Sequence, residues 1–278
     1  MQLLFFKQGL DSFRDKMMND GHIRQLTDFA NAKDCFPQNS ISGGVCYFLW
    51  ERDTQGNCLF TNVNNGKENV IYRPLNEFPV LVRYNAAVSI IHKVKAKDWL
   101  PFDSIVSPLM PYGLPTNYRG RDHKEYEDDL VLHASNGISY IRSNEISKGL
   151  ETVNGYKVLI SKTSAEHAGE PGADGMFRVL TSSTKVIGPG EVCTHSYFII
   201  GNYANRNEAE NTLSYLKTRF VRFLLLLSMS SINLSKLVFS FVPMQDFSKD
   251  WTDEELFEKY GLTDEEVSFI VSMIKTME

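Results

Sequence analysis

The feature that most constrains this chain is an unbroken apolar run, Val45 to Trp50, within the stretch SISGGVCYFLWERDTQGNCLF. A run of strand length that is rich in aromatic side chains and does not alternate with polar residues is typical of a strand buried on both faces. The polar turn 54–57 follows, and a second apolar run starts at Cys58. The pattern therefore predicts a hairpin in the middle of a layered domain, entered through a flexible joint at Gly43-Gly44.

Length and composition set the broad class. With 278 residues, of which 42% are hydrophobic, the chain can form two domains of ordinary size. Its four cysteines include no CxxC pair, so neither a zinc site nor a disulfide framework is indicated. Apolar runs such as Phe223 to Leu227 are far shorter than the roughly 20 residues of a membrane helix. We therefore expect a soluble, cytoplasmic protein with reduced thiols and no membrane partner.

The net charge of −5 is unevenly distributed along the chain. Ten acidic but only three basic residues fall between Gln245 and Glu278, so residues 1–244 carry a small excess of positive charge. The pattern indicates an acidic helical tail with a solvated face. Such a tail does not prevent a basic surface elsewhere.

Periodicity predicts an α/β order over the first hundred residues, with a helix at 10–19, a strand at 22–29, the hairpin at 45–63, a strand at 69–72 and a helix at 84–95. Prolines and glycines then crowd residues 101–120, which predicts a domain boundary there. The following part is rich in strands.

In that second part, apolar segments predict strands at 157–162, 176–180 and 192–200, with a long loop at 163–175 between the first two. Asn205 and Glu208 form a capping-box pair that predicts the start of one long helix reaching residue 227. Two further capping boxes predict short helices after Thr252 and Thr263.

Catalytic motifs are absent from the sequence. It contains no GxGxxG, no phosphate-binding GxxxxGK[ST], no GxSxG and no HExxH. The six histidines have no partner at ligand spacing, so we interpret them as structural or solvent-exposed residues. Glu125, Glu127, Asp128 and Asp129 form an acidic cluster that could hold a divalent metal, but no nuclease-like arrangement accompanies it. We therefore predict no metal site.

Three groups of residues suggest a nucleic-acid surface: a basic stripe on the long helix, basic residues on neighbouring strands and turns, and polar or stacking groups in the Pro/Gly segment. The stripe is equally compatible with a solvated helix face. The candidate DNA-binding residues are Tyr112, Asn117, Tyr118, Arg119, Arg121, Lys157, Lys162, Arg178, Lys185, Lys217, Arg219 and Arg222. We expect the lysines and the arginines after residue 150 to contact phosphates, and the loops 112–121 and 163–175 to contact bases.

The order of several segments resembles the carboxy-terminal half of restriction-modification adenine-specific DNA methyltransferases of the type II or IIG kind. The segments are GLDSFRDKMMND, FANAKDCFP, SISGGVCYFLWERD, YLKTRFVRFLLLL and WTDEELFEKYGLTDEEV, which together extend over almost the whole chain. The resemblance implies an α/β fold: the terminal part of a Rossmann-like methyltransferase domain at 1–100, an α+β target-recognition domain at 101–244, similar to those of type I specificity subunits, and the acidic helical tail at 245–278.

The sequence also departs from this family. The glycine-rich loop that holds S-adenosylmethionine and the Asn/Asp-Pro-Pro-Tyr/Phe loop that holds the flipped adenine are both missing. We therefore predict no catalytic residue and no cofactor site in this chain, and we interpret it as a fragment of an enzyme whose complete form uses S-adenosylmethionine.

The leading hypothesis is a module that recognises double-stranded DNA and pairs with an upstream methyltransferase catalytic part or subunit. Its open sheet edge could also cause self-association. Two alternatives remain open from the sequence. The chain could be a structural subunit that completes an active methyltransferase, or methyltransferase-nuclease, with a separate catalytic chain. It could also be a protein-interaction remnant that no longer touches DNA.

Overall fold

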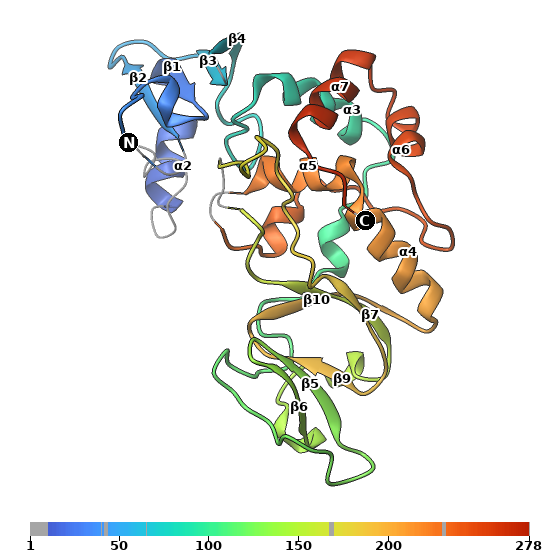
Figure 1. Ribbon diagram of the computed structural model, residues 1–278. Helices are drawn as coiled ribbons and strands as arrows, with labels where there is room; N and C mark the ends of the chain where they lie inside the picture. Colours follow the sequence, from blue (N-terminus) through green and yellow to red (C-terminus); the bar gives the residue numbers. More distant parts are fainter. Residues whose placement is uncertain are drawn as a thin grey trace.

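The computed structural model describes residues 11–39, 41, 44–64, 66–166, 170–229 and 232–277. The predicted start of the first helix at residue 10, the predicted joint at Gly43 and the histidine at 167 lie outside these residues. The described chain forms three small β-sheets together with α-helices and short 3-10 turns (Figure 1). This mixed composition confirms an α/β protein in the broad sense.

The N-terminal part forms a four-stranded sheet with one helix beside it (Figure 1). Its elements are α2 (Asp11–Asn19), β1 (Ile23–Phe29), β2 (Val45–Trp50), β3 (Cys58–Asn64) and β4 (Lys67–Arg73). The strand order is β2-β1-β3-β4, with β1 antiparallel to β2 and parallel to β3. The predicted hairpin at 45–63 is therefore wrong, because β1 lies between its two strands. The hairpin of this sheet joins β3 to β4, with Asn64 opposite Lys67.

Strand β2 forms at the predicted residues, but it is not buried on both faces. It lies at the edge of the sheet, and Tyr47 and Trp50 are 58% and 42% exposed. One face of the sheet packs on α2 and the segment after β4, through side chains such as Met18, Leu26 and Leu75. The opposite face carries Leu59 and Tyr72, which are also largely exposed. The sequence indicated correctly that the strand is apolar, but the residues that the structure describes do not cover it.

The body of the molecule contains the other two sheets (Figure 1). One has the order β10-β7-β8, with β7 (Tyr156–Ser161) between β8 (Lys185–Ile187) and β10 (Tyr197–Tyr203). The other has the order β6-β5-β9 and consists of β5 (Leu130–Ala134), β6 (Gly137–Ile141) and β9 (Glu191–Cys193). The helices of the body are α3 (Val88–Lys95), α4 (Arg206–Lys217), α5 (Arg219–Ser228), α6 (Asp253–Lys259) and α7 (Asp264–Met273).

Three elements of the body differ from the sequence prediction. The strand predicted at 192–200 is divided into β9 and β10 by a turn in which the Tyr197 amide donates to the Thr194 carbonyl. Residues 176–180 form no strand, and only Phe177 makes a bridge there, to Ile274. The single long helix is two helices, because Thr218 ends α4 and its hydroxyl caps α5 by accepting from the Val221 amide.

The N-caps predicted from the sequence are confirmed, but the pair Asn205 and Glu208 forms a single cap and not a reciprocal capping box. The Asn205 side chain accepts from the Glu208 amide at 3.0 Å, and complete capping boxes open α6 at Thr252 and α7 at Thr263. Caps depend on residues three positions apart, so sequence alone identifies them.

The acidic C-terminal segment is more than a solvated tail. Leu256, Ile270 and Ile274 are fully buried in the main core, beside α3 and α5. Glu266 accepts from Lys93 of α3 at 2.6 Å. The main core therefore draws on all three predicted segments, and the boundary predicted at residue 101 does not coincide with a separation between cores. The two cores meet instead near residues 75–82, where Leu75 and Leu81 belong to the N-terminal core and Phe78 and Val82 to the main core.

A polar joint ties the N-terminal sheet to the body. The carboxylate of Asp28 on β1 pairs with the Arg83 guanidinium at 2.7 Å, and both side chains are nearly buried. The Asn85 amide donates to the carbonyls of Phe60 and Asn69 at 2.8 Å, and so holds β3 and β4. Both anchoring residues come from the segment that leads into α3.

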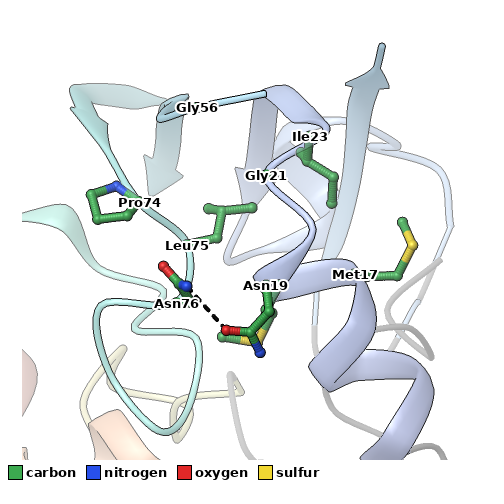
Figure 2. Close-up of a pocket in the computed structure, with 9 residues that line it drawn as sticks. Met17, Asn19, Gly21, Ile23, Gly56, Pro74, Leu75 and Asn76 are labelled. Carbon is green, nitrogen blue, oxygen red and sulfur yellow. Dashed lines mark hydrogen bonds between the residues drawn. The ribbon is translucent and has the colours of Figure 1, made fainter. Parts of the chain in front are cut away.

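A small pocket lies between α2 and the chain that follows β4, as Figure 2 shows. Its volume is about 40 Å³, and Gly21, Gly56 and Leu75 are among its lining residues. At its rim the side-chain amide of Asn76 donates to the side-chain oxygen Oδ1 of Asn19 at 3.0 Å. The space admits a water molecule but not a substrate.

Candidate nucleic-acid interface

The loop 112–121 presents fewer groups to solvent than the sequence suggested. Tyr112 is fully buried in the core of the β6-β5-β9 region, where its hydroxyl accepts from Thr152 at 3.0 Å. Burial also raises the pKa of this phenol. The structure therefore does not present Tyr112 to a base, as the sequence prediction requires. Asn117 and Arg119 are exposed, whereas the Tyr118 hydroxyl donates to the carboxylate of Glu145.

Arg121 is engaged within the protein rather than free for DNA. Its guanidinium lies 2.6 Å from Asp129 and 3.5 Å from Glu125. The Asp129 carboxylate also accepts from the backbone amides of Glu125 and Tyr126, so it holds a turn of the acidic segment in place. In the part of the chain that the structure describes, no group of acidic, histidine or cysteine side chains is arranged to hold a metal ion.

Lys157 lies inside the body, so the structure does not support its predicted phosphate contact. The residue is fully buried on β7, and its ammonium group donates to the carbonyls of Val153, Gly155 and Gly188 at 3.0 to 3.3 Å. Burial lowers its pKa to about 8. Lys157 therefore links the turn before β7 to the turn after β8. The alternation of residues along a strand could not predict this burial. The ammonium group of Lys157 donates to backbone carbonyls of the surrounding turns, and no sequence pattern shows which carbonyls will lie beside it.

The basic stripe predicted on the long helix is not one continuous surface, because Arg222 is buried whereas Lys217 and Arg219 are half-buried. Arg222 is 1% exposed and donates to the carbonyls of Lys217 at 2.9 Å and Arg178 at 3.1 Å. Burial lowers its pKa to about 10. Arg219 is half-buried and donates to the Thr276 hydroxyl. The physical reason is the break at Thr218, after which α5 runs through the main core with apolar neighbours on every side.

Three of the other predicted basic residues remain accessible to solvent: Lys162, Arg178 and Lys185. Arg178 is partly neutralised, because its guanidinium lies 3.2 Å from each of the carboxylates of Glu166 and Asp174. Lys185 is exposed on the short strand β8.

Lys162 lies beside a histidine, and the sequence did not predict this contact. It follows the end of β7, and its ammonium nitrogen lies 3.2 Å from Nε2 of His195, which precedes β10. Strand pairing brings them together, because Ser161 lies opposite Tyr197. The histidine was missed because only the register of β7 and β10, far apart in sequence, could have shown it.

The same pair connects the two predicted recognition loops. The His195 amide donates to the Leu114 carbonyl at 2.9 Å, which links it to the 112–121 loop. On the other side Lys162 is followed directly by the 163–175 loop, whose first residues bond to the segment 232–234. Hydrogen bonds thus link Leu114 of the first loop through His195 to Lys162, the residue before the second loop.

Comparison with known proteins gives one partial relationship. No family model matches the chain. The chain is similar to a protein of Mycoplasma pneumoniae described as an uncharacterized adenine-specific methylase, with 33% identity over 75 residues. The match covers 23% of this chain and 18% of that protein's length. It supports a relation to adenine-specific methylases. No helix among the described residues is long and apolar enough to cross a membrane.

Proposed function

We propose that this chain is part of an adenine-specific DNA methyltransferase, in which it recognises DNA and completes the catalytic α/β domain of a separate part. The observation that carries the proposal is strand β2. Among the described strands it pairs only with β1, it contains no charged residue from Val45 to Trp50, and it exposes large apolar side chains. An exposed apolar edge of this kind is a template for a further strand.

The sheet itself supports the same arrangement. Its central pair, β1 and β3, is parallel, and sheets with parallel strands are usually covered on both faces. The described chain covers only the face toward α2 and leaves Leu59, Val70 and Tyr72 exposed on the other. The partial similarity to a methylase favours the methyltransferase part that would hold S-adenosylmethionine and the target adenine as the missing neighbour.

Recognition of DNA is the finer part of the proposal. We assign base contacts to the exposed Asn117 and Arg119 of the 112–121 loop, whose amide and guanidinium groups can read base edges in the major groove. Phosphate contacts come from Lys162, Arg178 and Lys185, which remain accessible. These contacts position the duplex against the loops.

A co-expression experiment tests the partner. Leu49→Lys places a charge on β2 at a side chain that is 44% exposed, so the isolated fold tolerates it while the contact with a neighbouring strand does not. We expect the amount of the catalytic part that co-purifies with the variant to fall at least tenfold. The DNA methylation activity should fall by the same factor. The control is Leu150→Lys, at a 60% exposed leucine in the body. Equal co-purification of both variants would contradict the proposal.

A second function, that of a structural subunit without DNA contacts, is favoured by one set of observations. Tyr112, Lys157 and Arg222 are buried, and Arg121 is ion-paired within the protein. The two functions are separated by Asn117→Ala and Arg119→Ala in the completed enzyme. Each is expected to weaken binding to a preferred sequence by about 1–3 kcal/mol and to leave non-specific affinity unchanged. Unchanged affinity for every sequence would favour the structural subunit.

A further inference from the structure

The pair Lys162 and His195 has an arrangement that suggests a ligand. Two nitrogen atoms that can each carry a positive charge lie 3.2 Å apart, and both residues are partly accessible to solvent. The backbone fixes their positions, because the Lys162 amide donates to the Ser196 carbonyl at 2.9 Å and the His195 amide to the Leu114 carbonyl at 2.9 Å. These backbone bonds fix the positions from which the two side chains extend, and the 3.2 Å contact joins their ends.

Among the described residues, no carboxylate lies within 4.0 Å of the charged nitrogens of Lys162 or His195, so no acid balances this pair there. Arg178, in the same region, is by contrast compensated by Glu166 and Asp174. Neighbouring basic groups without an acid repel each other when both are charged, and an anion removes this repulsion.

The position of the pair identifies the kind of anion. It lies between the 112–121 loop, to which Leu114 connects it, and the 163–175 loop, which begins at the residue after Lys162. A duplex that is contacted by both loops brings its backbone across this point. The anion with the right charge and spacing is then a phosphodiester, whose two free oxygens accept hydrogen bonds from two donors.

We propose that Lys162 and His195 together bind one phosphate group of the nucleic-acid backbone, and that this contact takes up a proton on His195. In the free protein the Lys162 ammonium donates to the neutral Nε2 of His195. When a phosphate enters, Nε2 receives a proton from solvent, and both nitrogens donate to the phosphate oxygens. The inference rests on the proposed DNA function and adds a residue and a pH dependence to it.

The direction of the pH dependence follows from the charges. Burial first, and then the charge of Lys162, hold the pKa of His195 below its ordinary value in the free protein. A bound phosphate raises that pKa, because it stabilises the imidazolium. Proton uptake is therefore coupled to binding, and affinity increases as the pH falls. One coupled proton can change affinity by at most tenfold per pH unit.

DNA binding by the full chain tests the proposal. Anisotropy with a labelled duplex of mixed sequence, at constant ionic strength, is measured at pH 7.5 and pH 5.5. We expect the wild-type chain to gain about tenfold in affinity and His195→Gln to gain about twofold or less. The control is His123→Gln, because His123 is exposed and lies beside Glu125 in the acidic segment. It should keep the wild-type gain. Lys162→Met should weaken binding at both pH values.

A titration with inorganic phosphate separates this inference from the proposed function. The imidazole resonances of His195 are followed by NMR against pH, with and without phosphate. If phosphate raises the pKa of His195 but no duplex binds at any pH, the anion site stands and the DNA function is rejected. If a duplex binds and His195→Gln keeps the full pH gain, the DNA function stands and the inference is overturned. A pKa that neither phosphate nor duplex changes also overturns it.

Discussion

Strands β2 and β7 carry the same kind of sequence but have different surroundings. Both are six residues long and largely apolar, VCYFLW in β2 and YKVLIS in β7. β7 lies in the middle of its sheet, with Val158 and Ile160 in the main core and Leu159 in the core of the β6-β5-β9 region. β2 lies at an edge with Tyr47 58% exposed. An apolar run thus shows that a strand requires cover on both faces, but not that the same chain supplies it.

The largest expected difference comes from placing a charge on each strand. Val158→Asp buries a carboxylate at a fully buried position of β7 and should cost more than about 5 kcal/mol, enough to prevent folding. Tyr47→Asp, at an exposed position of β2, should cost less than about 1 kcal/mol. Urea unfolding followed by circular dichroism measures both. If Tyr47→Asp also unfolds the isolated chain, other residues already cover the side chain of Tyr47. The proposed difference in burial between β2 and β7 is then wrong.

The next largest effect concerns the joint between the two regions. Asp28→Ala removes the partner of Arg83, whose guanidinium then stays nearly buried without its carboxylate, and should cost about 3 kcal/mol. The double variant Asp28→Leu with Arg83→Met removes both charges and should cost clearly less than the single one. Urea unfolding of the three proteins gives the comparison. If the double variant is as unstable as Asp28→Ala, the loss of stability comes from packing around these side chains and not from the charge of Arg83 without its carboxylate.

The two strands also indicate how much could be predicted from sequence. Local signals were reliable: the helix at 11–19, the caps at Asn205, Thr252 and Thr263, and the existence of strands at 45–50 and 156–161. Each depends on residues within one turn or one strand. Pairing was not predictable, because it depends on which distant strand arrives beside another. That is why the hairpin at 45–63 was wrong.

In the candidate site, too, local features could be predicted from the sequence and contacts between distant residues could not. Basic residues were found by type, but Lys157 and Arg222 are held inside by carbonyl groups from distant turns, such as those of Gly188 and Arg178. His195 was overlooked because its neighbour Lys162 comes from another strand. Charge in a sequence indicates a possible contact surface, whereas the register of the sheet decides which charges reach it.

A moderate effect is expected from Lys157, the buried charge of β7. Lys157→Met leaves the carbonyl of Gly155 without this donor and should cost about 2 kcal/mol at pH 7, while Lys185→Met on exposed β8 should cost less than about 0.5 kcal/mol. Because burial lowers the pKa of Lys157 from 10.5 to about 8, the unfolded chain binds its proton more tightly. The stability of the wild-type chain relative to Lys157→Met should therefore increase between about pH 8 and pH 10.5. A constant difference would contradict the burial of this charge.

The smallest expected effect compares the residues that follow the two strands. After β7, the carboxylate of Glu166 accepts from the amides of Arg178 and Val179, each at 3.0 Å, and its side chain is only 11% exposed. These bonds hold a turn in which Val179 has a positive φ of 68°, which a β-branched residue adopts only under strain. After β2, Glu51 is 40% exposed and lies at the limit of ion-pair distance from Arg24.

Glutamine at these two positions keeps the size of the side chain and removes its charge. Glu166→Gln should lower the free energy of unfolding by about 1.5 kcal/mol, because the charge-assisted bonds become weaker and the oxygen that faces the Arg178 guanidinium is replaced by a donor. Glu51→Gln should change it by less than about 0.5 kcal/mol. Amide hydrogen exchange at Val179 should become about tenfold faster in Glu166→Gln, since 1.4 kcal/mol corresponds to a factor of ten in local opening. If the exchange rate at Val179 is unchanged, Glu166 does not stabilise this turn. The glutamate after β7 then contributes no more to local stability than Glu51 after β2.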